Sequence, residues 1–305
     1  MHINQYYKKW SIGPSDPEIR DDIELSVYHE DLNYISSSWL REGFKSMNRF
    51  LMYPFKPKSN TSESQRIGTM VHTYLLEPHR FNNVYHILKR EDLPFPSSTM
   101  AKKENKEYVE GLKSMNKEII DQETYLQVEQ MCKHVVSNKH IASYIENGKV
   151  ENSIYWNDAE TGLPMKSRPD LWVPLKNGKA VIIDLKTTDS AYPSDFFTSI
   201  SKYQYPVQAA IQCDAVTAAT GREIQAYMYL AIDKSYPFEH CMFRLTEDDI
   251  YASRLQYRDV LKQIRVCVET DTWPGYGRTQ IDKKLLDDNE LDVIDVLLPA
   301  WHYNK

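Results

Sequence analysis

Apolar positions in the first half of the chain recur with the spacing of an α-helix. Four apolar residues between Ile67 and Leu75 lie at i, i+4, i+7 and i+8, and they predict a helix over residues 66–77. Pro78 ends this helix, because proline cannot continue the hydrogen-bond ladder. Residues 101–146 are also helical in pattern, rich in alternating charge and without proline. This helical insertion is expected to expose most of its surface to solvent.

The pattern changes to strands near residue 151. Residues 151–188 predict three strands, with turns at Thr161-Gly162 and at Asn177-Gly178, the second being a strong hairpin signal. Residues 181–183 are apolar on both faces, which is typical of a central strand. Helices are predicted over residues 202–220 and 246–269, and strands over residues 224–232 and 238–245. This order predicts a mixed α/β fold with a central sheet flanked by helices.

Length and charge refine this prediction. The chain has 305 residues, with 37 basic and 43 acidic side chains and a net charge of −6. Much of the acidic excess lies in the last 25 residues, so the chain divides into an N-terminal extension (1–30), a single domain (31–280) and an acidic tail or helix (281–305). No strongly basic surface is expected, which argues against a passive nucleic-acid coat and leaves room for a local basic groove.

The cysteine spacing argues against a structural zinc or iron–sulfur protein, and the hydrophobicity of the chain argues against a membrane protein. The four cysteines, at positions 132, 213, 241 and 267, form no CxxC pair, so structural zinc and iron–sulfur ligation lack their usual spacing. No run of 18 apolar residues predicts a membrane span, and the N-terminus lacks the apolar core of a signal peptide. We expect a cytoplasmic protein without a membrane partner.

Two carboxylates and a lysine form the sharpest chemical pattern. Asp170 follows Pro169, and Asp184 and Lys186 follow on the next predicted strand, where alternation puts both on one face. Opposite charges on a central strand need a reason, because burying an unpaired charge is costly. A divalent metal between the carboxylates is one such reason, with the lysine positioning a water or a phosphate. A structural Asp–Lys pair is the alternative.

Two further side chains fit the same chemistry. His72 lies on the predicted helix 66–77, four residues after Gly68, and imidazole is a ligand for Mn²⁺ and tolerated by Mg²⁺. Gln208 lies one turn into the predicted helix after the lysine strand, facing the sheet, where an amide orients a water or a phosphate. Taken alone, a helical histidine is usually a core or surface residue, and a glutamine at this place is more simply explained by capping or packing.

Four segments in one order resemble a known family. GTMVHTYLLEP (68–78), RPD (168–170), DLKTT (184–188) and YQYPVQAA (203–210) resemble the motifs of the PD-(D/E)xK nuclease superfamily, and within it the RecE-type exonucleases and RecB-like nuclease domains. ISSS (35–38) and WPGY (273–276) also look like phage and prophage RecE-like members. The resemblance implies a restriction-endonuclease-like core with an N-terminal helical extension.

The resemblance also implies roles for individual residues. His72, Asp170, Asp184 and the backbone carbonyl of Leu185 match the metal ligands, Lys186 the catalytic lysine, Gln208 the motif glutamine, and Tyr205 the aromatic residue before it. Two positions depart from the family pattern: Gln212 stands where a tyrosine is usual, and Asp184 replaces the glutamate of many relatives. Glu151, at the opening of the first predicted strand, is expected to be an outer-shell carboxylate.

The implied activity is Mg²⁺-dependent hydrolysis of DNA, with Mn²⁺ as the alternative ion. RecE-like enzymes digest linear duplex DNA from the 5′ end as ring-shaped oligomers and work in recombination with a RecT-like single-strand annealing protein. The resemblance implies that the protein works in a bacterial or phage-infected cell. Candidate DNA contacts are Ser36, Ser37, Ser38, Lys45, Arg49, Arg66, Lys166, Arg168, Lys202 and Tyr205. The acidic segment 285–301 is interpreted either as a partner contact or as the last helix of the core.

Two other functions stay open at this level. One is a structure-specific or single-strand nuclease of the same fold. The other is a non-catalytic DNA-binding scaffold that kept the fold. The intact set of Asp170, Asp184 and Lys186 argues against the scaffold, because a nuclease-dead protein would have no chemical reason to keep all three.

Overall fold

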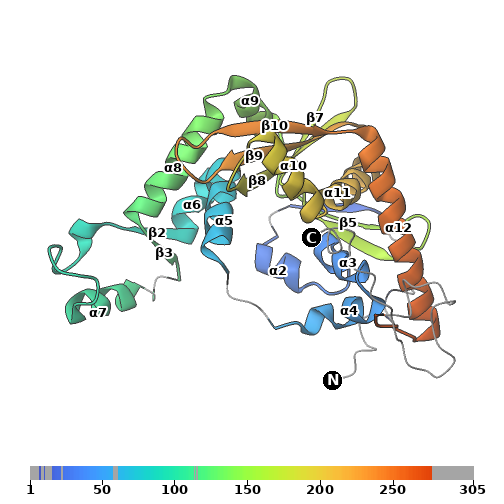
Figure 1. Cartoon of the computed structure of the whole chain (residues 1–305), viewed down its shortest axis with the longest axis horizontal. Coiled ribbons are helices and arrows are strands. Elements are labelled where there is room, and N and C mark those ends of the chain that lie inside the picture. The colour runs from blue at the N-terminus through green and yellow to red at the C-terminus, as the bar shows by residue number, and fades with distance from the viewer. Residues whose placement is uncertain are drawn as a thin grey trace, which may run out of the picture.

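A five-stranded mixed sheet carries the fold, in the order β10-β9-β8-β7-β4 (Figure 1). The computed structural model describes residues 7, 10, 16–21, 23–57, 61–112, 114 and 116–276. The strands are β4 (Lys149–Val150), β7 (Leu171–Pro174), β8 (Ala180–Thr188), β9 (Ile224–Asp233) and β10 (His240–Leu245). β8 and β9 run parallel, and the other neighbouring pairs are antiparallel. The predicted mixed central sheet is confirmed.

The central position of β8 follows from its sequence. Residues 180–185 are all buried, as the apolar run predicts. The Asn177-Gly178 turn joins β7 to β8, with Gly178 at φ +84°, a conformation that glycine adopts without strain. The segment from β8 to its parallel neighbour β9 contains α10 (Pro193–Lys202) and α11 (Tyr205–Thr220), since a parallel pair needs a long crossover.

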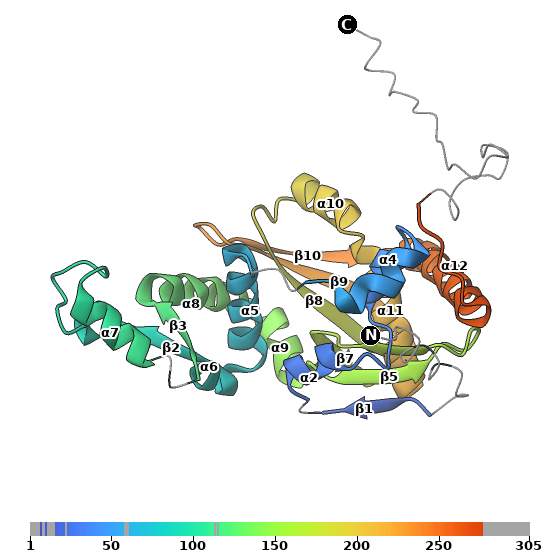
Figure 2. The same ribbon diagram turned by 90° about the horizontal axis from the view of Figure 1, so that it is seen from below.

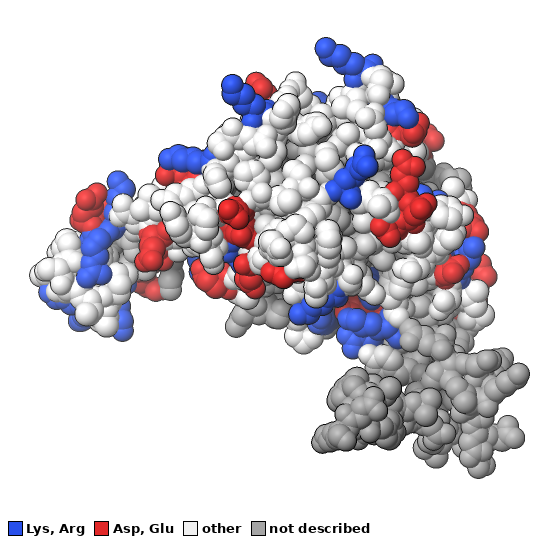
Figure 3. All heavy atoms as spheres, turned by 45° about the horizontal axis from the view of Figure 1, so that its top comes forward, with Lys and Arg blue, Asp and Glu red and all other residues white. Residues whose placement is uncertain are grey.

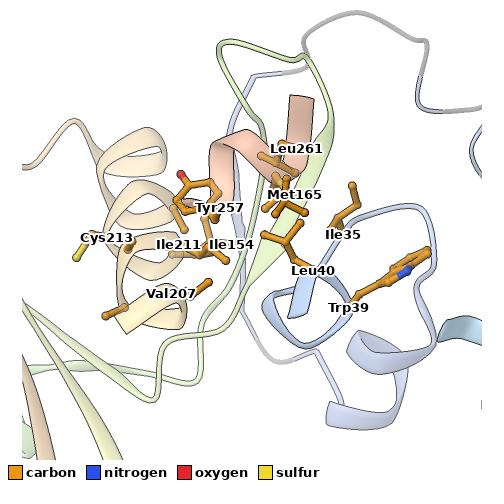
Figure 4. Close-up of a cluster of buried hydrophobic side chains, with 14 of the residues drawn as sticks. Ile35, Trp39, Leu40, Ile154, Met165, Val207, Ile211, Cys213, Tyr257 and Leu261 are labelled. Carbon is orange, nitrogen blue, oxygen red and sulfur yellow. The ribbon is translucent and has the colours of Figure 1, made fainter. Parts of the chain in front are cut away.

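One face of the sheet packs against α11, α12 (Glu247–Thr270) and a small three-stranded sheet. That sheet has the order β1-β5-β6, with bounds Glu18–Arg20, Ser153–Asn157 and Pro164–Ser167. Figure 4 shows its core, where Ile154 and Met165 of the small sheet meet Ile211 of α11 and Leu261 of α12. The helices α3 (Ser37–Gly43) and α4 (Met47–Met52), followed by the 3-10 turn η2 (Tyr53–Phe55), complete this layer.

The other face packs against α5 (Glu63–Leu76), α8 (Gln122–Val136) and α9 (Lys139–Asn147). The helix predicted over residues 66–77 is therefore α5, which begins three residues earlier. Ser62 and Gln65 form a capping box there, in which each side chain satisfies a backbone N–H group. Gly68 allows α5 to approach the end of β8, because a Cβ atom at this position would lie 3.0 Å from Thr187 Oγ1.

The insertion predicted over residues 101–146 is not helical throughout. It contains α7 (Lys103–Leu112), α8 and α9, but β3 (Glu118–Asp121) interrupts it and pairs in parallel with β2 (Tyr85–Leu88). Figures 1 and 2 show α7, β2 and β3 extending from the body of the molecule, with α6 (Pro78–Val84) at their base. Ile119 and Ile120 carry the strand signal, which the flanking charges and helical segments obscured. The 3-10 turn η3 (Arg90–Asp92) follows β2.

The described part of the N-terminal extension joins the core. Tyr7 and Trp10 belong to the main hydrophobic cluster, β1 pairs with β5, and α2 (Leu25–Glu30) follows. The acidic segment predicted over residues 281–305, including 285–301, lies outside the described residues. Within the described ranges, no helix is both long enough and apolar enough to cross a bilayer.

Candidate metal and catalytic centre

The candidate site lies where the sheet opens beside β8. The pairing of β7 with β8 ends at Leu171 and Ile183, whereas β8 continues to Thr188 along β9. The backbone of Leu185 therefore faces side chains instead of a strand. Its N–H group donates to Asp170 Oδ2 at 2.7 Å, and its carbonyl accepts a hydrogen bond from His72 Nε2 at 3.1 Å. The carbonyl predicted to face a metal is thus engaged by His72.

His72, Glu151 and Asp170 converge on one point. Their candidate ligand atoms all lie within 4.8 Å of one another. His72 Nδ1 is 3.7 Å from Asp170 Oδ2 and 3.9 Å from Glu151 Oε1. Because a carbonyl only accepts, His72 Nε2 carries a proton, and Nδ1 faces the carboxylates, where its lone pair would be available to an ion once the ring is neutral. Two carboxylates and an imidazole nitrogen fit a small divalent cation such as Mg²⁺ or Mn²⁺.

Asp184 lies beside this group rather than within it. Its side chain is fully buried, with Oδ1 accepting a hydrogen bond from Gln208 Nε2 at 3.1 Å and Oδ2 paired with Lys186. Asp184 and Lys186 share one face of β8, as strand alternation predicts, and that face meets α11. The predicted ligands are therefore arranged as two adjoining sets: His72 and Asp170 with Glu151, and Asp184 with Lys186 and Gln208.

The electrostatics of the site reflect burial and the surplus of carboxylates. Burial lowers the pKa of His72, but the carboxylates of Asp170 and Glu151 outweigh this effect and raise it to about 9. Burial raises the pKa values of the Asp170 and Asp184 carboxyl groups. Burial lowers the pKa of the Lys186 ammonium, but the carboxylates of Asp184 and Asp170 outweigh this effect and raise the pKa above its usual value. The Lys186 side chain therefore stays charged. A bound cation would offset the surplus of negative charge.

Metal binding to this site is expected to depend on pH. With a pKa of about 9, His72 is protonated at neutral pH and must lose its proton before Nδ1 binds an ion. The affinity for Mg²⁺ should therefore rise with pH, by about tenfold per unit between pH 6.5 and 8.5, and level off above pH 9. Calorimetric titration in buffers of different ionisation enthalpy measures the released proton. An affinity independent of pH over this range would contradict the assignment of His72, and His72→Gln should flatten the dependence.

Glu151 occupies a more central place than the sequence indicated. It follows β4, with φ +50°, a left-handed conformation that is uncommon and strained for residues other than glycine. Its Oε2 accepts a hydrogen bond from Arg168 Nε at 2.9 Å. This backbone turn and the ion pair aim the carboxylate at His72 and place it beside Asp170, within reach of the same ion, while the outer-shell role stays a prediction. The sequence carried no local motif for it.

Three predicted DNA contacts have other partners. The Arg168 side chain is only 7% exposed and donates to the Ile23 carbonyl as well as to Glu151, so it holds the Glu151 carboxylate in place. Lys166 is buried, and its ammonium donates to the carbonyls of Tyr28 and Asp31 at the end of α2. Arg66 forms ion pairs with Glu63 and Glu118 at 2.8 Å, which ties α5 to β3.

A cleft of about 1250 Å³ surrounds the metal-ligand candidates. Its lining includes Ser36, Ser37, Ser38, Gly68, His72, Glu151, Arg168, Asp170, Tyr203, Tyr205 and Gln208. Ser36 also caps α3, since its side chain accepts a hydrogen bond from Trp39 N, whereas all three serines line the cleft. The face drawn in Figure 3 carries interspersed basic and acidic side chains instead of one basic patch, in keeping with the net charge.

The fold and the site together define a protein of the PD-(D/E)xK class. The chain belongs to the family described as "PDDEXK-like domain of unknown function" (DUF3799), which matches residues 36–284. The crystal structure of a protein from Eubacterium rectale, which carries a provisional exonuclease name, is similar in fold. It has a TM-score of 0.58 and 13% identity, and the alignment covers 86% of this chain and 92% of that chain.

A second crystal structure, of a protein called SSO0001, aligns at 16% identity over 65% of this chain and 86% of that chain. Its TM-score is 0.28, too low to bear on the fold. A search of curated proteins finds no relative of this chain.

Proposed function

We propose that this protein is a metal-dependent deoxyribonuclease that hydrolyses DNA phosphodiester bonds. The observation that carries the proposal is that Asp170, Asp184 and Lys186 lie together with His72 and Glu151 at the open edge of β8, beside a large cleft. A structural Asp–Lys pair would not need a second carboxylate pair and an imidazole next to it. The non-catalytic scaffold is disfavoured for the same reason.

Each residue has a defined part in this reaction. When bound, a Mg²⁺ or Mn²⁺ ion would lower the pKa of a water molecule and stabilise negative charge on the phosphate. His72, Asp170 and Glu151 supply the ligand atoms that would hold it. Lys186, held by Asp184, keeps its positive charge beside the site and positions the nucleophile or the phosphate. Gln208 fixes the Asp184 carboxylate through its hydrogen bond.

The finer proposal is a 5′-to-3′ exonuclease acting on linear double-stranded DNA in recombination. The motif order of RecE-type exonucleases supports it, and so does the provisional exonuclease name of the Eubacterium rectale protein. The same resemblance suggests Mg²⁺ as the physiological ion, a ring-shaped oligomer, a RecT-like annealing partner, a phage or prophage origin and a cytoplasmic location. Ser36, Ser37, Ser38 and Tyr205 are the proposed DNA contacts that line the cleft.

Digestion of end-labelled duplex DNA tests this proposal. Linear duplex labelled separately at the 5′ and 3′ ends is incubated with Mg²⁺, next to a covalently closed circle. We expect early release of the 5′ label and an intact circle, because a 5′ exonuclease needs an end. Cutting of the circle, or of single strands only, would replace the finer proposal with a structure-specific or single-strand nuclease. DNA binding without cleavage in Mg²⁺ or Mn²⁺ would favour the scaffold.

A further inference from the structure

Two tyrosine rings form a stack that leads from Lys186 to the solvent. The Lys186 ammonium lies 4.8 Å from the centre of the Tyr205 ring. Tyr203 stacks on Tyr205, with ring centres 5.6 Å apart and planes inclined by 25°. The Tyr203 side chain lies at the solvent end of the stack, is 47% exposed and lines the cleft that contains His72 and Asp170.

The backbone between the two tyrosines favours this arrangement. On a continuous α-helix, the side chains of residues two apart do not face each other. Gln204 adopts a left-handed conformation with φ +53°, which turns the chain between α10 and α11 and brings the two rings together. Non-glycine residues in this conformation are strained, and such strain gathers at functional sites. Tyr205 is fixed from behind by Tyr229 at 5.8 Å and Phe196 at 6.4 Å, so the stack has a rigid base.

We infer that the outer ring, Tyr203, stacks against an unpaired base of the DNA strand being cut, next to the scissile phosphate. This inference rests on the proposed DNA substrate and specifies its form, since a base that stacks on protein has left the duplex stack. A partly exposed aromatic ring beside a phosphate-binding cation is the arrangement that binds single strands without sequence preference. Lys202, whose ammonium lies 5.3 Å from the Tyr203 ring centre, supplies a charge for the adjoining backbone phosphate.

A fluorescence measurement tests the stacking without requiring cleavage. A single-stranded oligonucleotide with 2-aminopurine near its 5′ end is bound in Ca²⁺, which replaces Mg²⁺ to slow hydrolysis. Stacking should quench the fluorophore with wild-type protein and with Tyr203→Phe, which keeps the ring. Tyr203→Ala should leave it bright at saturating protein. Tyr251→Ala removes an exposed tyrosine of α12 outside the cleft and should behave as wild type. Equal brightness with wild type and Tyr203→Ala would overturn the inference, as would failure of the wild type to bind the oligonucleotide.

Cleavage separates this inference from the proposed function. A linear duplex whose cut strand carries an abasic residue next to the labile bond should be cut about tenfold more slowly than the intact duplex by wild type, and Tyr203→Ala should abolish that difference. Equal rates on both substrates by the wild type would refute the stacking while leaving the nuclease in place. No hydrolysis of either substrate would refute the nuclease proposal, and the fluorescence result then decides the stacking alone.

Discussion

Replacing Asp184 by asparagine is expected to reduce DNA cleavage by about a thousandfold or more. Asp184 is fully buried between Gln208 and Lys186, so asparagine preserves the volume and an acceptor for Gln208 while removing the negative charge. That charge holds the Lys186 ammonium in place. Together with Asp170, Asp184 forms the carboxylate pair at the open edge of β8. Initial rates on linear duplex DNA measure the loss, and a gel shift in Ca²⁺ should show that binding to DNA persists.

The stability of Asp184→Asn must be measured together with its activity, because Lys186 loses its charged partner in this variant. A buried charge without its partner is destabilising, although Lys186 keeps 17% of its side chain exposed and Asp170 is a second source of attraction. Thermal unfolding should show a melting temperature well above that of the assay. Asp259→Asn, at an exposed position of α12, is the matched control and should keep full activity. Cleavage by Asp184→Asn within tenfold of wild type, in a folded protein, would refute the assigned role.

Lys186→Ala is expected to abolish cleavage to a similar extent while leaving metal binding in place. The lysine contacts Asp184 and Tyr205 and is not among the three converging ligand candidates, so its loss removes a charge beside the phosphate and not a ligand. Calorimetry should therefore still show Mg²⁺ binding at pH 8, with an affinity no weaker than that of wild type, because removal of a nearby positive charge favours a bound cation.

The comparison with Lys202 sharpens this prediction. Lys202 is an exposed lysine at the end of α10, near Tyr203 rather than Asp184. Lys202→Ala should weaken DNA binding and leave the rate at saturating DNA largely unchanged. If Lys186→Ala remains fully active, the assignment of Lys186 as the catalytic lysine is wrong.

Strong local signals explain why much of the fold could be predicted. The apolar run and the Asn-Gly turn indicated that β8 is central and pairs with β7, and α11 ends at Thr220, where the helix predicted over residues 202–220 also ends. These features depend on residues close in sequence, whose physical preferences act locally. β3 was missed because only four residues form it, between helices rich in charge.

The candidate site was predictable only in part, because its geometry depends on contacts between distant segments. Alternation along β8 put Asp184 and Lys186 on one face, and the motif order brought Asp170 and His72 to the same region. Nothing local showed that Arg168 would be buried against Glu151, since an arginine near a motif is more often exposed. The same holds for the Tyr203 stack, which requires the left-handed turn at Gln204.

Release of nucleotides from linear duplex DNA tests the central claim most directly. Purified wild-type protein and Asp184→Asn, prepared identically, are incubated with the DNA in Mg²⁺ and in EDTA, and acid-soluble nucleotide is measured. The account predicts release by the wild type in Mg²⁺, no release in EDTA, and almost none by Asp184→Asn. No release by the wild type in either Mg²⁺ or Mn²⁺, or equal release by both proteins, would contradict it.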